Sequence, residues 1–196
     1  MGVKSYRKKG GIVEIPFLQA KYYRAVPLTT PRKVDLVVLH CAEVAESAGG
    51  AEWLLKYCAA NDRVASWHYA VDCDSITQSV READVAYHAP GANANGIGIE
   101  MATLGRPTAA MWADAYSQKM MTLAAFLTAG ICARHKIEPF FVDAAGLLEK
   151  RRGVTTHAQV TLAFKQGDHT DPGPDFPVHD FLAKVKARLD AGNFQL

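Results

Sequence analysis

The sequence has no apolar run long enough to cross a membrane. Its longest mostly apolar stretch, residues 120–133, has 14 residues, whereas a bilayer span needs about 20. The N-terminus also lacks the apolar segment and small-residue cleavage site of a secretory signal. We therefore expect no membrane insertion, synthesis in the cytoplasm of the producing cell, and action elsewhere only after release by another route.

An excess of charge of one sign is missing too. Lys and Arg number 22 against 20 Asp and Glu, a net charge of +2. The chain as a whole is therefore not a polycation of the kind that indicates a nucleic-acid partner. The first 13 residues are nevertheless basic: Lys4, Arg7, Lys8 and Lys9 precede the first acid, Glu14. We interpret this segment as a solvated arm. A weak electrostatic tether to an anionic polymer or surface is the alternative.

Metal-binding signatures based on cysteine pairs or on a single helix are also absent. The four cysteines form no C-x-x-C pair, which argues against a cysteine-based zinc site, and we expect buried, reduced thiols. No H-E-x-x-H occurs among the seven histidines, which disfavours a zincin-type peptidase.

What is present indicates one globular domain, because 196 residues leave little room for a second. We divide the chain into a basic lead-in, residues 1–33, and a folded domain, residues 34–196. The alternation of apolar strands and amphipathic helices predicts an α/β or mixed α+β class. The predicted strands are 35–40, 97–101, 154–156 and a hairpin of 67–72 with 76–80; the predicted helices are 51–60, 112–136 and 178–191, and a loop is expected after 156.

Polar residues end or follow the predicted strands. His40 ends DLVVLH, Glu100 ends GIGIE, His157 follows VTT, and Asp171 lies in a loop stiffened by two prolines. Two imidazoles and a carboxylate suit Zn²⁺ with an open fourth position. A lone histidine at a strand end is more often structural, so the hypothesis of a zinc site depends on the combination of both histidines with the carboxylate.

Five segments occur together in an order that resembles the zinc-dependent N-acetylmuramoyl-L-alanine amidases. They are DLVVLH (35–40), SWHYAVD (66–72), YHAPGANANGIGIE (87–100), TTH (155–157) and HTDPGPDF (169–176). This group includes phage endolysins, amidases that recycle muropeptides, and peptidoglycan recognition proteins. The resemblance covers about residues 34–183 and implies a single domain with a central mixed β-sheet flanked by helices.

Carried over residue by residue, the resemblance implies that His40, His157 and Asp171 bind zinc. Glu100 matches a carboxylate that transfers protons in hydrolytic members. His169 matches a position that often holds Lys, and we expect it to donate a hydrogen bond to the oxyanion. That replacement is a departure from the family pattern.

Four further residues are candidates for substrate binding. Trp67 stands where many relatives have Tyr, and a core aromatic is the alternative interpretation. His88, Asn93 and Asn95 precede GIGIE and could contact peptide or sugar. Turn formation is an equally good explanation for the two asparagines.

The resemblance implies zinc-dependent hydrolysis of the amide between N-acetylmuramic acid and L-alanine of peptidoglycan. We expect a phage or prophage endolysin that acts as a monomer on the cell wall after release. A cytoplasmic muropeptide-recycling amidase, a non-catalytic peptidoglycan-binding module and another zinc hydrolase are the alternatives. The retained ligand candidates and Glu100 favour an enzyme over a binding module.

Overall fold

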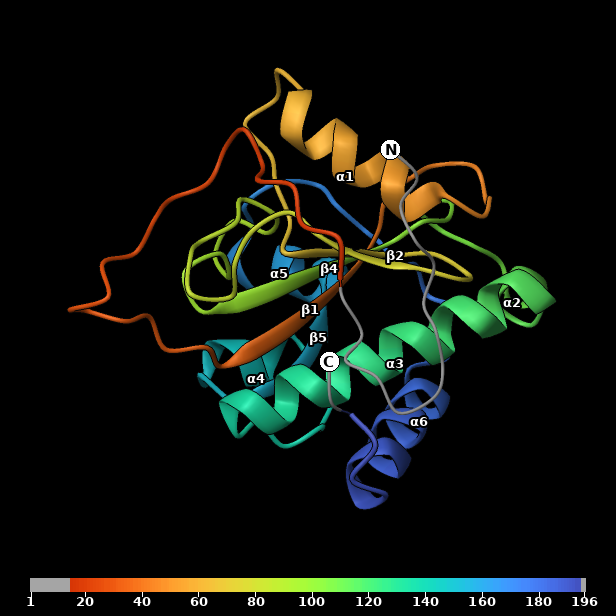
Figure 1. Ribbon diagram of the computed structural model, residues 1–196. Helices are drawn as coiled ribbons and strands as arrows, with labels where there is room; N and C mark the ends of the chain where they lie inside the picture. Colours follow the sequence, from red (N-terminus) through yellow and green to blue (C-terminus); the bar gives the residue numbers. More distant parts are fainter. Residues whose placement is uncertain (1–14, 195–196) are drawn as a thin grey trace.

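One five-stranded mixed sheet forms the centre of the computed structural model, which describes residues 15–194 (Figure 1). The strand order is β3-β2-β4-β1-β5, in which β1 pairs in parallel with β4 and β5, β2 pairs in parallel with β4, and β3 runs antiparallel to β2. The strands are β1 (Leu36–Cys41), β2 (Tyr69–Val71), β3 (Ile76–Gln78), β4 (Gly96–Met101) and β5 (Gly153–Thr156). The predicted mixed sheet and the predicted hairpin are confirmed.

Helices cover both faces of this sheet (Figure 1). They are α1 (Gly50–Ala60), α2 (Ala109–Trp112), α3 (Ala115–His135), α4 (Ala144–Leu148), α5 (His157–Phe164) and α6 (Val178–Asp190). The long helix α3 and the C-terminal helix α6 pack on one face, whereas α1, α4 and α5 lie on the other.

Alternating residues of β1 belong to two separate cores. Val37 and Leu39 pack on the side of α3 and α6, whereas Leu36 and Val38 pack on the side of α4 and α5. Successive side chains of a strand point to opposite faces, so a strand covered on both faces becomes a continuous apolar run. This explains why the strand was predictable from DLVVLH alone.

The predicted helix over 112–136 corresponds to α3, which begins three residues later because Trp112 belongs to the separate short helix α2. The Asp114 side chain accepts a hydrogen bond of 2.8 Å from the Ser117 amide and begins α3 after Trp112 has ended α2. Helix α3 is buried on more than one side. Both its sheet-facing side and its α6-facing side are buried.

The prediction of a loop directly after residue 156 is wrong, because α5 begins there. Thr156 is the last residue of β5 and also the N-cap of α5, since its hydroxyl accepts from the Gln159 amide at 3.4 Å. The spacing T-x-x-Q is an N-terminal helix signature that could have indicated this helix.

Part of the predicted lead-in packs against the sheet. Phe17 forms a bridge with Gln78, and the Ala20 amide donates to the Ser79 carbonyl at 2.8 Å. The basic residues at positions 4–9 lie outside the described residues, and the division at residue 33 stays a prediction. Between residues 15 and 194, no helix has the length and apolar character needed to span a bilayer.

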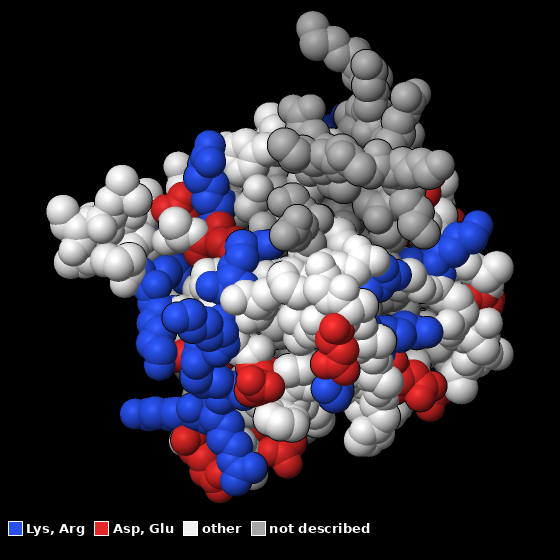
Figure 2. Space-filling model, turned by 60° about the horizontal axis from the view of Figure 1, so that its bottom comes forward, with Lys and Arg blue, Asp and Glu red and all other residues white. Residues whose placement is uncertain are grey.

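Basic side chains gather on one side of the molecule, with acidic side chains among them (Figure 2). Ion pairs neutralise part of the positive charge near the start of β1, where Lys33 and Arg152 both contact Asp35, at 3.1 and 2.9 Å. Surface pairs of this kind contribute little to stability.

A more buried network joins the end of α3 to the sheet through Glu82. Its carboxylate accepts from Arg134 and His135 at 2.6 Å each and from the Tyr69 hydroxyl at 2.8 Å. Burial raises the pKa of Glu82, but the hydrogen bonds from His135 and Arg134 outweigh it and lower the pKa to about 2. His135 and Arg134 therefore tie the end of α3 to the sheet through Glu82.

We predict that Glu82→Gln lowers the free energy of unfolding at pH 7 by about 1.5–3 kcal/mol, the usual contribution of hydrogen bonds to a charged group. Because the folded-state pKa is depressed, this stabilisation is present above pH 4.5 and is lost as the pH falls toward 2. Urea unfolding at several pH values measures the difference.

Glu149→Gln removes an exposed ion pair with Arg151 and is the matched control, expected to change stability by less than about 0.5 kcal/mol. A Glu82→Gln variant as stable as this control at pH 7 would show that the network is not stabilising.

Candidate metal centre

The register of β1 against its two neighbours brings the candidate residues together. His40 in β1 lies beside Glu100 in β4, and Leu39 lies beside Thr156 in β5, so that His157 follows at the same end of the sheet. The carboxyl ends of parallel strands form a common edge, which is where ligand sites of such sheets are found.

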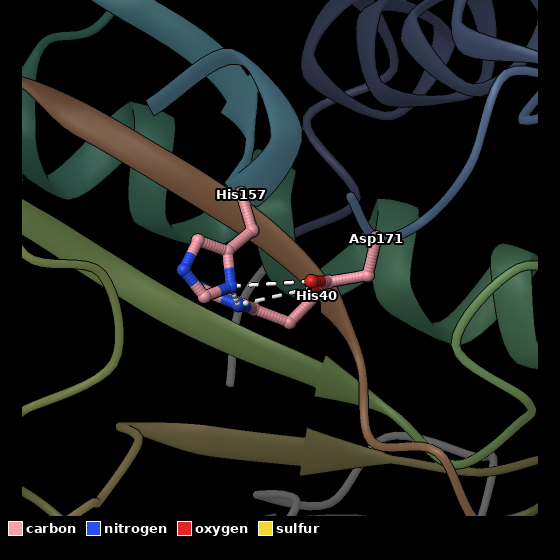
Figure 3. A group of neighbouring side chains, drawn as sticks. All are labelled: His40, His157 and Asp171. Carbon is pink, nitrogen blue, oxygen red and sulfur yellow. Dashed lines mark hydrogen bonds and ion pairs between the residues drawn. The ribbon is translucent and has the colours of Figure 1, made fainter. Parts of the chain in front are cut away.

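His40, His157 and Asp171 converge with their donor atoms close together (Figure 3). Nδ1 of His40 lies 3.0 Å from Nδ1 of His157 and 3.4 Å from Oδ2 of Asp171, and Nδ1 of His157 lies 3.2 Å from Oδ1 of Asp171. Tetrahedral bonds of 2.0–2.1 Å place neighbouring ligand atoms about 3.3–3.4 Å apart. The two nitrogens, and each nitrogen with one oxygen of Asp171, are thus about as far apart as two ligands of a single tetrahedral metal ion.

Backbone contacts hold Asp171 in this position. Its Oδ2 accepts from the Cys41 amide at 3.2 Å, and its carbonyl accepts from the Ala158 amide at 3.0 Å. The carboxylate is therefore fixed both to the end of β1 and to the first turn of α5, although it comes from a loop.

The electrostatics of the buried group favour the protonation states that a metal ion requires. Burial is the main cause that lowers the pKa of His40 to about 4. Burial raises the pKa of Asp171, but the hydrogen bonds with His157 and His40 dominate and hold it well below its usual range. A neutral imidazole and an ionised carboxylate are the forms that bind metals.

Glu100 borders this group. Its Oε1 lies 4.0 Å from Nδ1 of His40, and its buried Oε2 has no hydrogen-bond partner among residues 15–194. Burial and the nearby charge of Asp171 raise its pKa well above the usual value. A carboxyl group with an unused oxygen beside a metal position can take up and release a proton.

His169 lies at the outer rim of the group. Its ring stacks on His157 with centroids 4.1 Å apart and planes 14° apart, and its Nδ1 lies 3.7 Å from Oδ1 of Asp171. Its side chain is 53% exposed, so it can reach a ligand that enters from solvent.

The four predicted substrate-binding residues do not gather at this rim. Trp67 is buried in the layer between the sheet and α1 and stacks on Tyr57, with planes 4° apart. Asn93 uses its Oδ1 to accept from the amides of His88 and Ala89, at 2.9 and 2.7 Å, which is turn formation.

Asn95 precedes β4 and lies five residues from Glu100, about 16 Å along the strand. Its carbonyl accepts from the amides at residues 35 and 36. His88 is buried, and its Nδ1 lies 3.0 Å from Nε2 of His40, on the side of that ring away from Asp171.

Two residues near β4, the buried His68 and the half-buried Arg32, were not singled out by the sequence. His68 accepts from the Gly98 amide at 3.0 Å through Nδ1, and burial lowers its pKa to about 3. Arg32, which falls in the predicted lead-in, donates to the Gly96 carbonyl at 2.6 Å and to the Asp84 carbonyl. No local sequence pattern predicts such long-range contacts, although SWHYAVD marked His68 as part of a motif.

A second group of potential ligands, Asp72, Cys73 and Asp74, is explained by hydrogen bonding. Asp72 is fully buried, and its Oδ2 accepts from the amides of Gly49 and Ala51 at the start of α1. Its Oδ1 accepts from the Ser75 amide and hydroxyl, at 2.7 and 3.0 Å. These oxygens join α1 to the β2–β3 turn.

Comparisons with known proteins indicate a family and a shared fold. A family model described as N-acetylmuramoyl-L-alanine amidase matches residues 30–174. A search of curated proteins found no match.

Solved structures share the fold at low sequence identity. The Staphylococcus aureus hydrolase AmiA, solved in complex with its ligand, is 18% identical over 93% of this chain and 87% of its own, with a TM-score of 0.69. A selenomethionine derivative of AmpD is 20% identical, with coverages of 91% and 98% and a TM-score of 0.60. A mutant endolysin from Bacillus subtilis is 18% identical, with coverages of 88% and 99% and a TM-score of 0.57.

Proposed function

Because the chain belongs to the N-acetylmuramoyl-L-alanine amidase family, we propose that it uses zinc to hydrolyse the amide between N-acetylmuramic acid and L-alanine of peptidoglycan. The observation that carries this proposal is the buried group of His40, His157 and Asp171, in which the two Nδ1 atoms lie 3.0 Å apart and 3.4 and 3.2 Å from the two oxygens of Asp171. Glu100 beside them supplies the proton-transferring group that a hydrolase needs.

The donor set fits zinc by its chemistry. Nδ1 of His40, Nδ1 of His157 and one carboxylate oxygen of Asp171 would hold the ion. Three protein ligands would leave one coordination position for water or substrate, as in catalytic zinc sites. When bound, Zn²⁺ polarises a carbonyl group and makes water nucleophilic near neutral pH.

Glu100 moves the proton. It accepts a proton from the attacking water and delivers it to the leaving nitrogen of L-alanine, so the C–N bond breaks without releasing an unstable amide anion. Its buried Oε2, unpartnered within the described chain, is free to form these hydrogen bonds. Burial and the charge of Asp171 raise the pKa of Glu100. A cation held nearby would favour the ionised form.

His169 stabilises negative charge on the carbonyl oxygen of the substrate. Its stacking on His157 fixes the plane of the ring, and its exposure lets it reach the scissile amide. A hydrogen-bond donor to the oxyanion typically raises kcat about 10²–10³-fold.

We further propose that the protein is an endolysin of a phage or prophage that acts on the cell wall after release. Structural neighbours that are endolysins or catalytic domains of similar length support this role. A muropeptide-recycling amidase is the second candidate, supported by the similarity to AmpD. The two roles differ in the size of the preferred substrate.

We predict that the zinc-loaded protein clears suspensions of purified cell walls and creates new L-alanine amino termini. Plain peptides without N-acetylmuramic acid should remain intact. Turbidity and amino-terminus labelling measure the two effects. Cleavage of small soluble muropeptides without clearing of walls would overturn the endolysin role, and cleavage of plain peptides would overturn the proposed substrate.

We predict that Glu100→Gln lowers kcat by about 10²–10⁴-fold, the usual contribution of a general acid–base group. The variant should still bind one equivalent of zinc, because Gln keeps the shape of the side chain. Steady-state kinetics and metal analysis measure the two quantities. Glu149→Gln, the same change on an exposed side chain, should behave as wild type. Retention of full activity by Glu100→Gln would contradict the proton-transfer role.

A further inference from the structure

His88 sits behind a proposed zinc ligand rather than in a position to contact substrate. Its Nδ1 lies 3.0 Å from Nε2 of His40, and the two ring planes are at 89°. The other nitrogen of His40, Nδ1, faces His157 and Asp171. Both histidines are buried, with exposures of 8% for His88 and 2% for His40.

We propose that His88 is a positioning residue that fixes the tautomer and orientation of His40 for metal binding. This inference rests on the proposed zinc site. A His40 ring that binds a metal through Nδ1 carries its proton on Nε2, because the ligating nitrogen must offer a lone pair. Nδ1 of His88 is the nitrogen next to that proton and accepts it in a hydrogen bond.

The surroundings of His88 hold its ring in this position. The side chain of Asn93 accepts from the amides of His88 and Ala89, which fixes the backbone. The ring lies against β4 at Gly98, where a Cβ atom would stand 2.6 Å from Cγ and 2.8 Å from Nδ1 of His88. Glycine inside a strand marks a close approach of this kind. The segment YHAPGANANGIGIE thus contains His88, the Asn93 side chain that fixes its backbone, and the strand residue Gly98 against which its ring packs.

The test is the dissociation constant for Zn²⁺, measured on the full chain by competition with a chromophoric chelator after the metal has been stripped. His88→Leu keeps the bulk and removes the acceptor, and it should weaken zinc binding about 10- to 100-fold, the range for lost outer-shell partners. His88→Asn places an amide oxygen near the position of Nδ1 and should lose less than about tenfold. His179→Leu, a change in an exposed part of α6, is the matched control and should bind zinc as wild type does.

The outcomes separate this inference from the proposed function. Wild-type protein that binds no zinc would overturn both. Tight wild-type binding with unchanged affinity in His88→Leu would overturn the positioning role alone, as would His88→Asn binding as weakly as His88→Leu. A raised KM with unchanged zinc affinity would instead assign His88 to substrate binding, as its sequence context first indicated.

If His88→Leu does not fold, nitrogen-15 NMR of the zinc-loaded wild-type protein gives the answer directly. The expected spectrum assigns the His40 proton to Nε2 and shows slow exchange with water, as a buried hydrogen bond requires. Assignment of the proton to Nδ1 of His40 would overturn the proposal.

Discussion

Parallel pairing of β1 with both β4 and β5 is the constraint on which the site depends. That register places His40 beside Glu100 and brings the end of β5, and hence His157, to the same edge. Asp171 reaches this edge from a loop and is held there by the Cys41 amide of β1. A shift of one residue in either pairing would turn the strand side chains to the opposite face.

The central position of β1 in the sheet also determines the surroundings of the proposed metal ligand His40. Because β1 is buried on both faces, an imidazole at its end is withdrawn from water, and burial lowers the pKa of His40 to about 4. A buried polar ring needs partners for both nitrogens. His40 has them, with Asp171 and His157 on one side and His88 on the other. The absence of a side chain at Gly98 gives His88 the space to be one of them.

Strands and helices with a regular pattern of apolar residues were predictable from the sequence. Contacts that depend on packing between distant segments were not. Strands such as DLVVLH were predictable because burial on both faces produces an apolar run that ends in a polar residue. The start of α5 was missed because Thr156 is at once the end of a strand and a helix cap. The contact of Arg32 with the Gly96 carbonyl spans 64 residues and follows no period. The position of His88 behind His40 depends on packing against β4, which no spacing reveals.

The proposed activity requires that two imidazoles and one carboxylate from distant parts of the chain hold a single zinc ion. Metal analysis of the purified wild-type protein and of Asp171→Ala tests it most directly, with circular dichroism to show that both are folded. We expect one equivalent of zinc in the wild-type protein and much less than one in the variant. A folded Asp171→Ala variant that retains a full equivalent would contradict it.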